Sequence, residues 1–148
     1  FLIACLFYSI IYMYEYHRAL LLFSLLIVWV ADSGAYFVGR KYGKNKLAPS
    51  ISPGKTIEGA AGALLLTTLF AFLFADYFSL PVEKSLVYAI IITLFSIFGD
   101  LFESYLKRAA NLKDSGNIIP GHGGVLDRID GICASIPIIF SLIIFFPS

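Results

Sequence analysis

Long apolar segments alternate with shorter polar ones along most of this 148-residue chain. A helix that crosses a bilayer needs about 20 consecutive, mostly apolar residues. Four segments fit that requirement, and a fifth at the start of the chain resembles a shortened one. These segments cover residues 19–38, 57–74, 85–102, 126–146 and 1–14. Because helices are the only periodicity present, we predict an all-α, polytopic transmembrane bundle that forms a single domain over residues 1–148.

The composition also indicates a lipid environment. Hydrophobic residues make up 59% of the chain and charged residues only 14%. A soluble domain is about half apolar, and one of this length could not hide so many apolar side chains from water. The chain begins at Phe1, inside an apolar segment and without a preceding charged segment. We therefore expect the C-terminal part of a longer chain rather than a signal peptide.

The polar segments between the expected helices differ in length and charge. Segments 15–18 and 75–84 are short, whereas 39–56 and 103–125 are longer and rich in Gly, Pro and Lys. All of the 11 Lys and Arg residues except Arg18 and Lys84 lie in or beside these two long segments. Because Lys and Arg concentrate in cytoplasmic loops, we predict that both long loops face the cytoplasm.

Two functional classes are disfavoured by the same composition. The net charge of +1 argues against a nucleic-acid-binding protein, which needs a concentrated basic surface. Cys5 and Cys133 show neither CxxC spacing nor a nearby His. Buried free thiols are therefore expected rather than a zinc or redox site.

Several acids lie in or near the expected membrane segments. A charged residue there costs about 2.5–3.5 kcal/mol on insertion scales, so Asp32 and Asp100 either reach water at the interface or face a wet cavity. Glu103 follows Asp100 by three residues, which places both on one helical face. Asp127 and Asp130 repeat that spacing.

Convergence of Asp100, Asp127 and Asp130 would require a compensating cation, because carboxylates repel one another strongly in a low-dielectric pocket. Hard oxygen ligands without His or Cys favour magnesium, which commonly shares its coordination with phosphates and water. A nucleoside triphosphate is therefore a natural second ligand of such a site.

The first long loop contains a candidate phosphate-binding segment at residues 52–56. It combines a glycine, Lys55 and two hydroxyl groups just before the helix expected to begin at Ile57, whose N-terminus can attract an anion. A Walker A loop would also need a glycine five positions before Gly54, where the chain has Pro49. The P-loop interpretation is therefore rejected.

Glycines surround His122 in the second long loop, which indicates tightly folded backbone near a ligand. A single His is more often structural than catalytic, so His122 alone is weak evidence for a general base. The complete series of motifs over residues 104–130 is more specific, and it resembles the phosphatidate cytidylyltransferase family without a departure. These motifs are Ser104-Tyr105-Leu106-Lys107-Arg108, Lys113-Asp114-Ser115-Gly116, Pro120-Gly121-His122-Gly123-Gly124 and Asp127-Arg128-Ile129-Asp130.

Motifs earlier in the chain resemble the same family, so the resemblance covers about the last four-fifths of the sequence. They are Trp29 with Asp32-Ser33-Gly34-Ala35-Tyr36, Gly39-Arg40, Ser52-Pro53-Gly54-Lys55-Thr56 and Glu58-Gly59. The resemblance implies transfer of the cytidylyl group of CTP to phosphatidic acid, giving CDP-diacylglycerol and pyrophosphate. It also implies magnesium, with room for a second cation, a homodimer, and a bacterial inner-membrane location with the active site facing the cytoplasm.

The resemblance assigns roles to individual residues. The implied metal ligands are Asp100, Asp127 and Asp130, with Asp32 and Glu103 as further contributors. Lys113 and Arg128 join the three aspartates as catalytic residues. The implied substrate-binding residues are Ser52, Lys55, Thr56, Lys107, Arg108, Asp114, His122, Gly123 and Gly124. Each of the cations could instead be a positive-inside anchor, and Asp114 could pair with one of them.

Three other functions share some of these sequence features. Intramembrane acids also line the ion paths of transporters, but those polar groups should be distributed across the bilayer, whereas here they gather near one face. CTP-dependent lipid kinases and the archaeal ether-lipid cytidylyltransferase resemble this family more closely. The uninterrupted signature favours phosphatidate as the acceptor.

Overall fold

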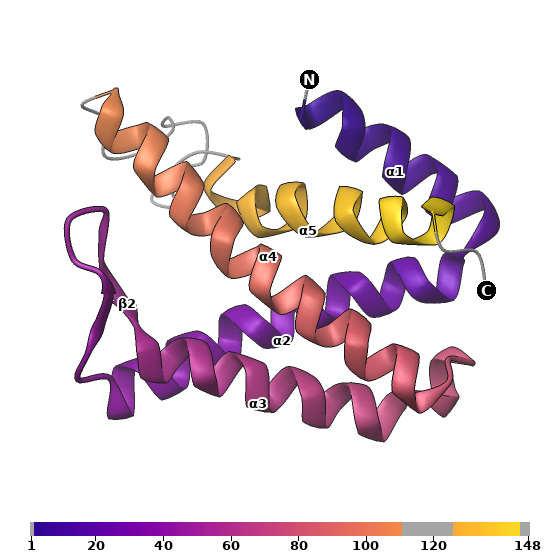
Figure 1. Ribbon diagram of the computed structural model, residues 1–148, viewed down its shortest axis with the longest axis horizontal. Helices are drawn as coiled ribbons and strands as arrows, with labels where there is room; N and C mark the ends of the chain where they lie inside the picture. Colours follow the sequence, from indigo (N-terminus) through magenta and orange to yellow (C-terminus); the bar gives the residue numbers. More distant parts are fainter. Residues whose placement is uncertain (1, 111–125, 146–148) are drawn as a thin grey trace.

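The computed structural model describes residues 2–110 and 126–145 and contains a bundle of helices with a β-hairpin at one end (Figure 1). The predicted all-α fold class is confirmed, and the hairpin is a small addition to it. The helices are α1 (Leu2–Tyr16), α2 (Arg18–Tyr42), α3 (Ile57–Phe74), α4 (Val82–Ala109) and α5 (Leu126–Phe145), with a short 3-10 turn, η1 (Asp76–Phe78), between α3 and α4.

Three of these helices, α2, α3 and α4, are long and apolar enough to cross a membrane. The apolar stretches of the other two are shorter, Ile3–Tyr16 in α1 and Asp130–Phe145 in α5. Large apolar side chains point outward from all three long helices; Phe37, Leu65 and Phe98 are 68%, 64% and 60% exposed, respectively. Lipid is the environment in which such a surface is stable, so the bundle is suited to integration into a membrane.

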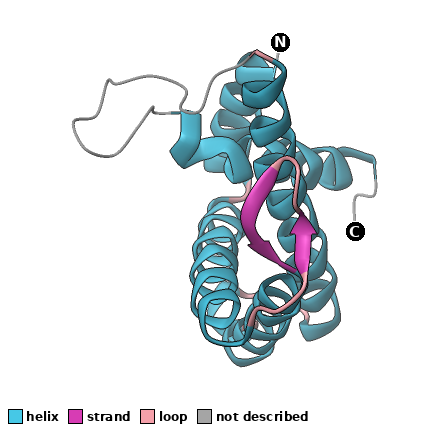
Figure 2. Cartoon of the chain, turned by 90° about the vertical axis from the view of Figure 1, so that its left-hand side faces the viewer, coloured by secondary structure: helices cyan, strands magenta, loops and turns pink. Residues whose placement is uncertain are grey.

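The first expected loop, 39–56, contains more regular structure than predicted. Helix α2 continues to Tyr42, and strands β1 (Lys46–Ala48) and β2 (Ser52–Thr56) then pair in an antiparallel hairpin. Figure 2 looks onto this end of the molecule and shows both strands in front of the helices. The prediction missed the strands because they are very short and because Pro53 and Gly54 are typical of turns.

The second expected loop, 103–125, begins too early in the prediction. Helix α4 continues through Ala109, so Glu103, Lys107 and Arg108 lie on its last turns. Hydropathy detects only the part of a helix that lies in lipid, and it therefore cannot find an end that extends into the polar interface.

Two polar side chains fasten the hairpin to the start of α3. The Thr56 Oγ1 accepts a hydrogen bond from the Gly59 backbone N–H at 3.1 Å and so caps the helix. The Glu58 carboxylate accepts hydrogen bonds from the backbone N–H groups of Lys44 and Asn45 and from the Asn45 side chain. The chain between α2 and α3 is thereby held against the first turn of α3.

Small residues allow α2 and α3 to pack closely. A Cβ atom added at Gly62 would lie 2.5 Å from Val38, and one added at Gly34 would lie 2.9 Å from Leu66. Such contacts are typical of helices that associate in membranes, where close van der Waals packing replaces the hydrophobic effect. The closely packed α2–α3 pair therefore holds the hairpin that connects these two helices.

Candidate functional site

The contact between α4 and α5 near the hairpin end is also made by glycines. A Cβ atom at Gly99 would lie 2.7 Å from the Asp130 carbonyl oxygen, and one at Gly131 would lie 2.5 Å from the Ser96 Oγ. The two backbones can therefore approach only because these positions lack side chains. Each glycine is next in sequence to an aspartate, so the close approach also brings Asp100 and Asp130 together.

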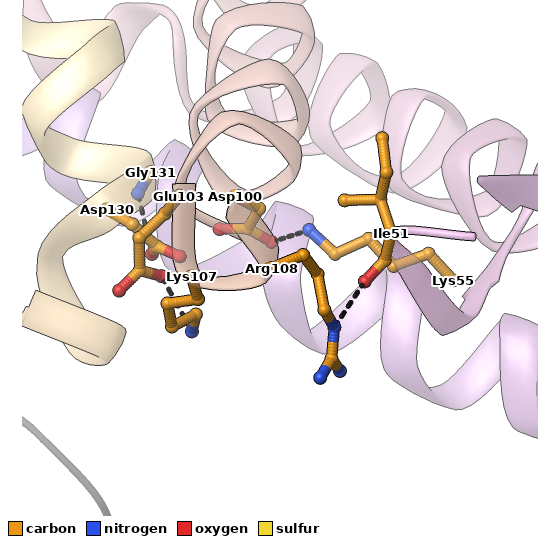
Figure 3. A network of polar contacts seen from close by, with 8 residues as sticks. All are labelled: Ile51, Lys55, Asp100, Glu103, Lys107, Arg108, Asp130 and Gly131. Atoms are coloured by element: carbon orange, nitrogen blue, oxygen red, sulfur yellow. Dashed lines mark hydrogen bonds and ion pairs between the residues drawn. The ribbon is translucent and has the colours of Figure 1, made fainter. Parts of the chain in front are cut away.

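Three carboxylates gather at this contact. The Asp130 carboxyl group lies close enough to those of Asp100 and Glu103 to interact with both (Figure 3). Its Oδ1 accepts a hydrogen bond from the Gly131 backbone N–H at 2.8 Å. The predicted helical face with Asp100 and Glu103 is thus observed, and Asp130 joins it from α5.

Glu103 is almost completely buried, with 7% of its surface exposed. Its Oε2 lies 3.3 Å from the Lys107 Nζ, one turn later on α4. Its Oε1 is buried without a hydrogen-bond partner among the described residues. A buried carboxylate oxygen without a partner is costly, so this atom is suited to receive a ligand.

Asp100 also forms an ion pair, with Lys55 of β2 (Figure 3). Both side chains are about one-quarter exposed and line a cavity of about 240 Å³ between α2, α3, α4 and the hairpin. Asp32 of α2 lines the same cavity and interacts electrostatically with Asp100 and Lys55. Residues far apart in the sequence therefore meet at one site that is both acidic and basic.

Tyr36 is a further lining residue of this cavity that the sequence analysis did not assign to the site. Its hydroxyl oxygen accepts a hydrogen bond from Arg40 Nη1 at 2.8 Å. Tyr36 follows Asp32 by four residues, and on a helix that spacing places two side chains on the same face. The spacing could therefore have identified it.

Other predicted substrate-binding residues have structural partners. Thr56 lines the cavity but is buried and uses its Oγ1 as the cap of α3. Arg108 donates from Nε to the Ile51 carbonyl oxygen at 3.4 Å, which connects the end of α4 to the hairpin. Ser52 begins β2 and pairs with Ala48. Lys107 lies beside Glu103 and does not line the cavity.

Several predicted site residues lie outside the described part of the structure. For Asp127 and Arg128 the backbone belongs to α5, but the side chains are not described. The remaining ones, in the segment between α4 and α5, are Lys113, Asp114, His122, Gly123 and Gly124.

The described residues do not by themselves contain a group of three His, Cys, Asp or Glu side chains arranged as a metal centre. Their chemistry nevertheless fits magnesium, because Asp100, Glu103 and Asp130 supply hard oxygen atoms. The unpartnered Oε1 of Glu103 is an available donor among them. The site residues are therefore compatible with the predicted cation.

This geometry defines a class of protein: a helical membrane bundle with a site of carboxylates and a lysine at one end. The chain belongs to the cytidylyltransferase family, whose model matches residues 1–146. It is 45% identical over 136 residues to the phosphatidate cytidylyltransferase of Bacillus subtilis, covering 89% of this chain and 50% of that protein. It is 47% identical over 133 residues to the enzyme of the same name from Haemophilus influenzae, covering 86% and 46%. The chain thus spans about half the length of the curated relatives it matches.

Proposed function

We propose that this chain carries the catalytic site of a phosphatidate cytidylyltransferase, which converts CTP and phosphatidic acid to CDP-diacylglycerol and pyrophosphate. The observation that carries the proposal is the meeting of Asp100, Glu103 and Asp130 with Lys55 at one end of a membrane bundle. The names of the relatives supply the identity of the substrates.

In the proposed reaction, an oxygen of the phosphatidate phosphate attacks the α-phosphorus of CTP. A new P–O bond forms as the bond between the α-phosphorus and the bridging oxygen breaks, and that oxygen leaves with pyrophosphate. The attacking phosphate is ionised at neutral pH, so alignment and charge neutralisation matter more than a strong base.

Magnesium, when bound, would supply charge neutralisation at the phosphates. Asp100, Glu103 and Asp130 would hold it, together with Asp127, and Asp32 lies close enough to Asp100 to contribute to the same acidic site. The resemblance to the family allows a second cation here.

The proposed role of Lys55 is to bind a triphosphate oxygen. In the structure its charge is matched by Asp100, and a triphosphate offers it a more highly charged partner. Lys55 lies on the hairpin and lines the cavity with Asp32 and Asp100, which supports this end of the bundle as the meeting place of a soluble nucleotide and a lipid headgroup. A cytoplasmic orientation in a bacterial inner membrane and a homodimer belong to the same proposal.

The test uses the full-length gene product in detergent with labelled CTP and magnesium. Phosphatidic acid should give CDP-diacylglycerol and pyrophosphate in equal amounts. Diacylglycerol as acceptor distinguishes a lipid kinase, which would form phosphatidic acid and CDP, and an unsaturated ether-lipid phosphate distinguishes the archaeal type of enzyme. Absence of CDP-diacylglycerol with phosphatidic acid, or product formation at the unsubstituted rate by both Asp127→Asn and Asp130→Asn, contradicts the proposal.

A further inference from the structure

A second hollow, of about 670 Å³, lies at the end of the bundle opposite the hairpin. The first turns of α2 and α4 line it, together with the ends of α1 and α5 and the turn after η1. None of the residues assigned to the proposed active site lies among the residues that line it. Its chemistry must therefore be considered separately.

The polar lining of this hollow is basic. His17, Arg18 and Lys84 all line it, and no Asp or Glu among the described residues does. Within the described parts of the chain, neither Arg18 nor Lys84 forms an ion pair. Arg18 donates from Nε to the Tyr14 carbonyl oxygen at 2.9 Å, which orients the guanidinium and leaves its terminal nitrogens without a described acceptor. Two cations near the proposed active site differ in this respect, because Lys55 and Lys107 have carboxylate partners.

The two helix starts add to this positive potential, and Glu83 in the first turn of α4 offsets part of it. Neither α2, with His17 at its N-cap, nor α4, with Pro81, has a side-chain cap. Arg18 and Lys84 lie in the first turns of these helices, where the helix dipole disfavours a cation. An anion in the hollow would interact favourably with both side chains and both helix starts, and it would relieve their mutual repulsion.

The remaining walls indicate which anion fits. Leu80, Ile143 and Ile144 provide apolar surface, and Tyr16 and Tyr88 provide aromatic rings of the kind that gather at membrane interfaces. The hollow lies where α2 and α4, both long enough to cross a membrane, begin. That is the depth of lipid headgroups, where basic residues attract anionic lipids.

We propose that this hollow binds the phosphate headgroup of an anionic phospholipid, independently of the proposed active site. Arg18 and Lys84 contact the phosphate, and the apolar wall contacts the glycerol and the upper part of the acyl chains.

The test measures lipid retention by native mass spectrometry of the full-length protein in neutral detergent, titrated with phosphatidylglycerol or with phosphatidylcholine. Phosphatidylglycerol should be retained preferentially. The double substitution Arg18→Gln with Lys84→Gln should weaken its retention about tenfold or more, since each basic residue contributes appreciably to binding of an anionic lipid. Arg18→Lys with Lys84→Arg should retain most of the binding.

The matched control is Lys44→Gln with Lys46→Gln, which removes the same charge from exposed positions at the hairpin end. Equal weakening by the control pair would show general attraction to the protein and overturn the proposal, as would equal retention of the two lipids. Inorganic phosphate forms a separate arm: if it displaces phosphatidylglycerol at low millimolar concentration, the site prefers a soluble anion and the lipid assignment fails. Gel filtration and thermal unfolding of each variant verify that it is folded.

Discussion

The junction between the hairpin and α3 and the contact between α4 and α5 each contain a glutamate, but the two carboxylates have different surroundings. Glu58, at the junction, accepts hydrogen bonds from the Lys44 and Asn45 backbones and from the Asn45 Nδ2 at 2.8 Å. Glu103, at the helix contact, leaves one buried oxygen without a described partner.

The difference distinguishes Glu58, whose carboxylate has a structural role, from Glu103, whose carboxylate is available to bind a ligand. A carboxylate whose oxygens accept backbone hydrogen bonds fixes the path of the chain, and its removal affects that path. A buried carboxylate oxygen without a partner lowers stability, and such groups are retained where a ligand compensates for the cost. Two glutamates near the same end of the molecule therefore need not have the same role.

The largest expected effect comes from Asp100→Asn. This substitution removes the charge shared between Lys55 and the carboxylate cluster, and CDP-diacylglycerol formation should fall by about a hundredfold or more. The assay is initial rate with saturating substrates. Asp76→Asn, an exposed aspartate in η1 at the opposite end, is the matched control and should retain activity. A rate for Asp100→Asn within about threefold of the control would show that the cluster has no catalytic role.

Gly99→Val tests whether the close contact of α4 and α5 positions the cluster. Its Cβ would lie 2.7 Å from the Asp130 carbonyl oxygen and 2.8 Å from the Ala134 Cβ, so the helices must separate. We expect a loss of about 1–3 kcal/mol in unfolding free energy, typical of overpacking, and a loss of activity. Gly54→Ala is the control for stability alone, because a Cβ there meets nothing within 4 Å, although Gly54 lines the cavity. Unchanged thermal unfolding of Gly99→Val would mean that the contact is looser than described.

Glu103→Gln should affect chemistry more than stability. We expect about a tenfold lower rate and a higher magnesium requirement, since a neutral amide is a poorer ligand for a hard cation. The unfolding temperature should change little, because removal of a buried charge offsets the loss of the ion pair with Lys107. Magnesium titrations and thermal unfolding in the same detergent measure both. A lower unfolding temperature with an unchanged magnesium requirement would instead assign Glu103 a structural role.

Glu58→Gln should show the opposite pattern and the smallest effect on activity. The substitution weakens the hydrogen bonds to the chain at Lys44 and Asn45, so we expect a modestly lower unfolding temperature and faster proteolysis of residues 43–56. The initial rate should change by less than about threefold. Loss of activity without faster proteolysis would contradict the distinction between the two glutamates.

The helices could be predicted well because their cause is local. The bounds predicted for the helix at 57–74 agree with α3, where the apolar segment begins directly after the cap residue Thr56. The end of α4 was predicted seven residues too early, at residue 102 instead of Ala109, because that part of the helix is polar and hydropathy does not detect it. The hairpin was missed for a different reason: its strands are only three and five residues long, and Pro53 and Gly54 within the second are typical of turns.

The candidate site could be predicted in part. The helical spacing predicted a shared face for Asp100 and Glu103, which the structure shows, whereas the cation that charge considerations require stays a prediction. The pairing of Asp100 with Lys55 could not be predicted, because it joins elements far apart in the sequence and depends on how α2, α3 and α4 pack. The roles of Asp127 and Arg128 stay predictions.

The ion pair between Lys55 and Asp100 also has a consequence for biosynthesis. Its partners are 45 positions apart, so at about 5–20 residues per second the ribosome makes Asp100 about 2–9 s after Lys55. During that interval Lys55 still lacks its partner. The contact between Lys55 and Asp100 therefore forms only after α3 and most of α4 have been synthesised, so this end of the molecule is completed late in translation.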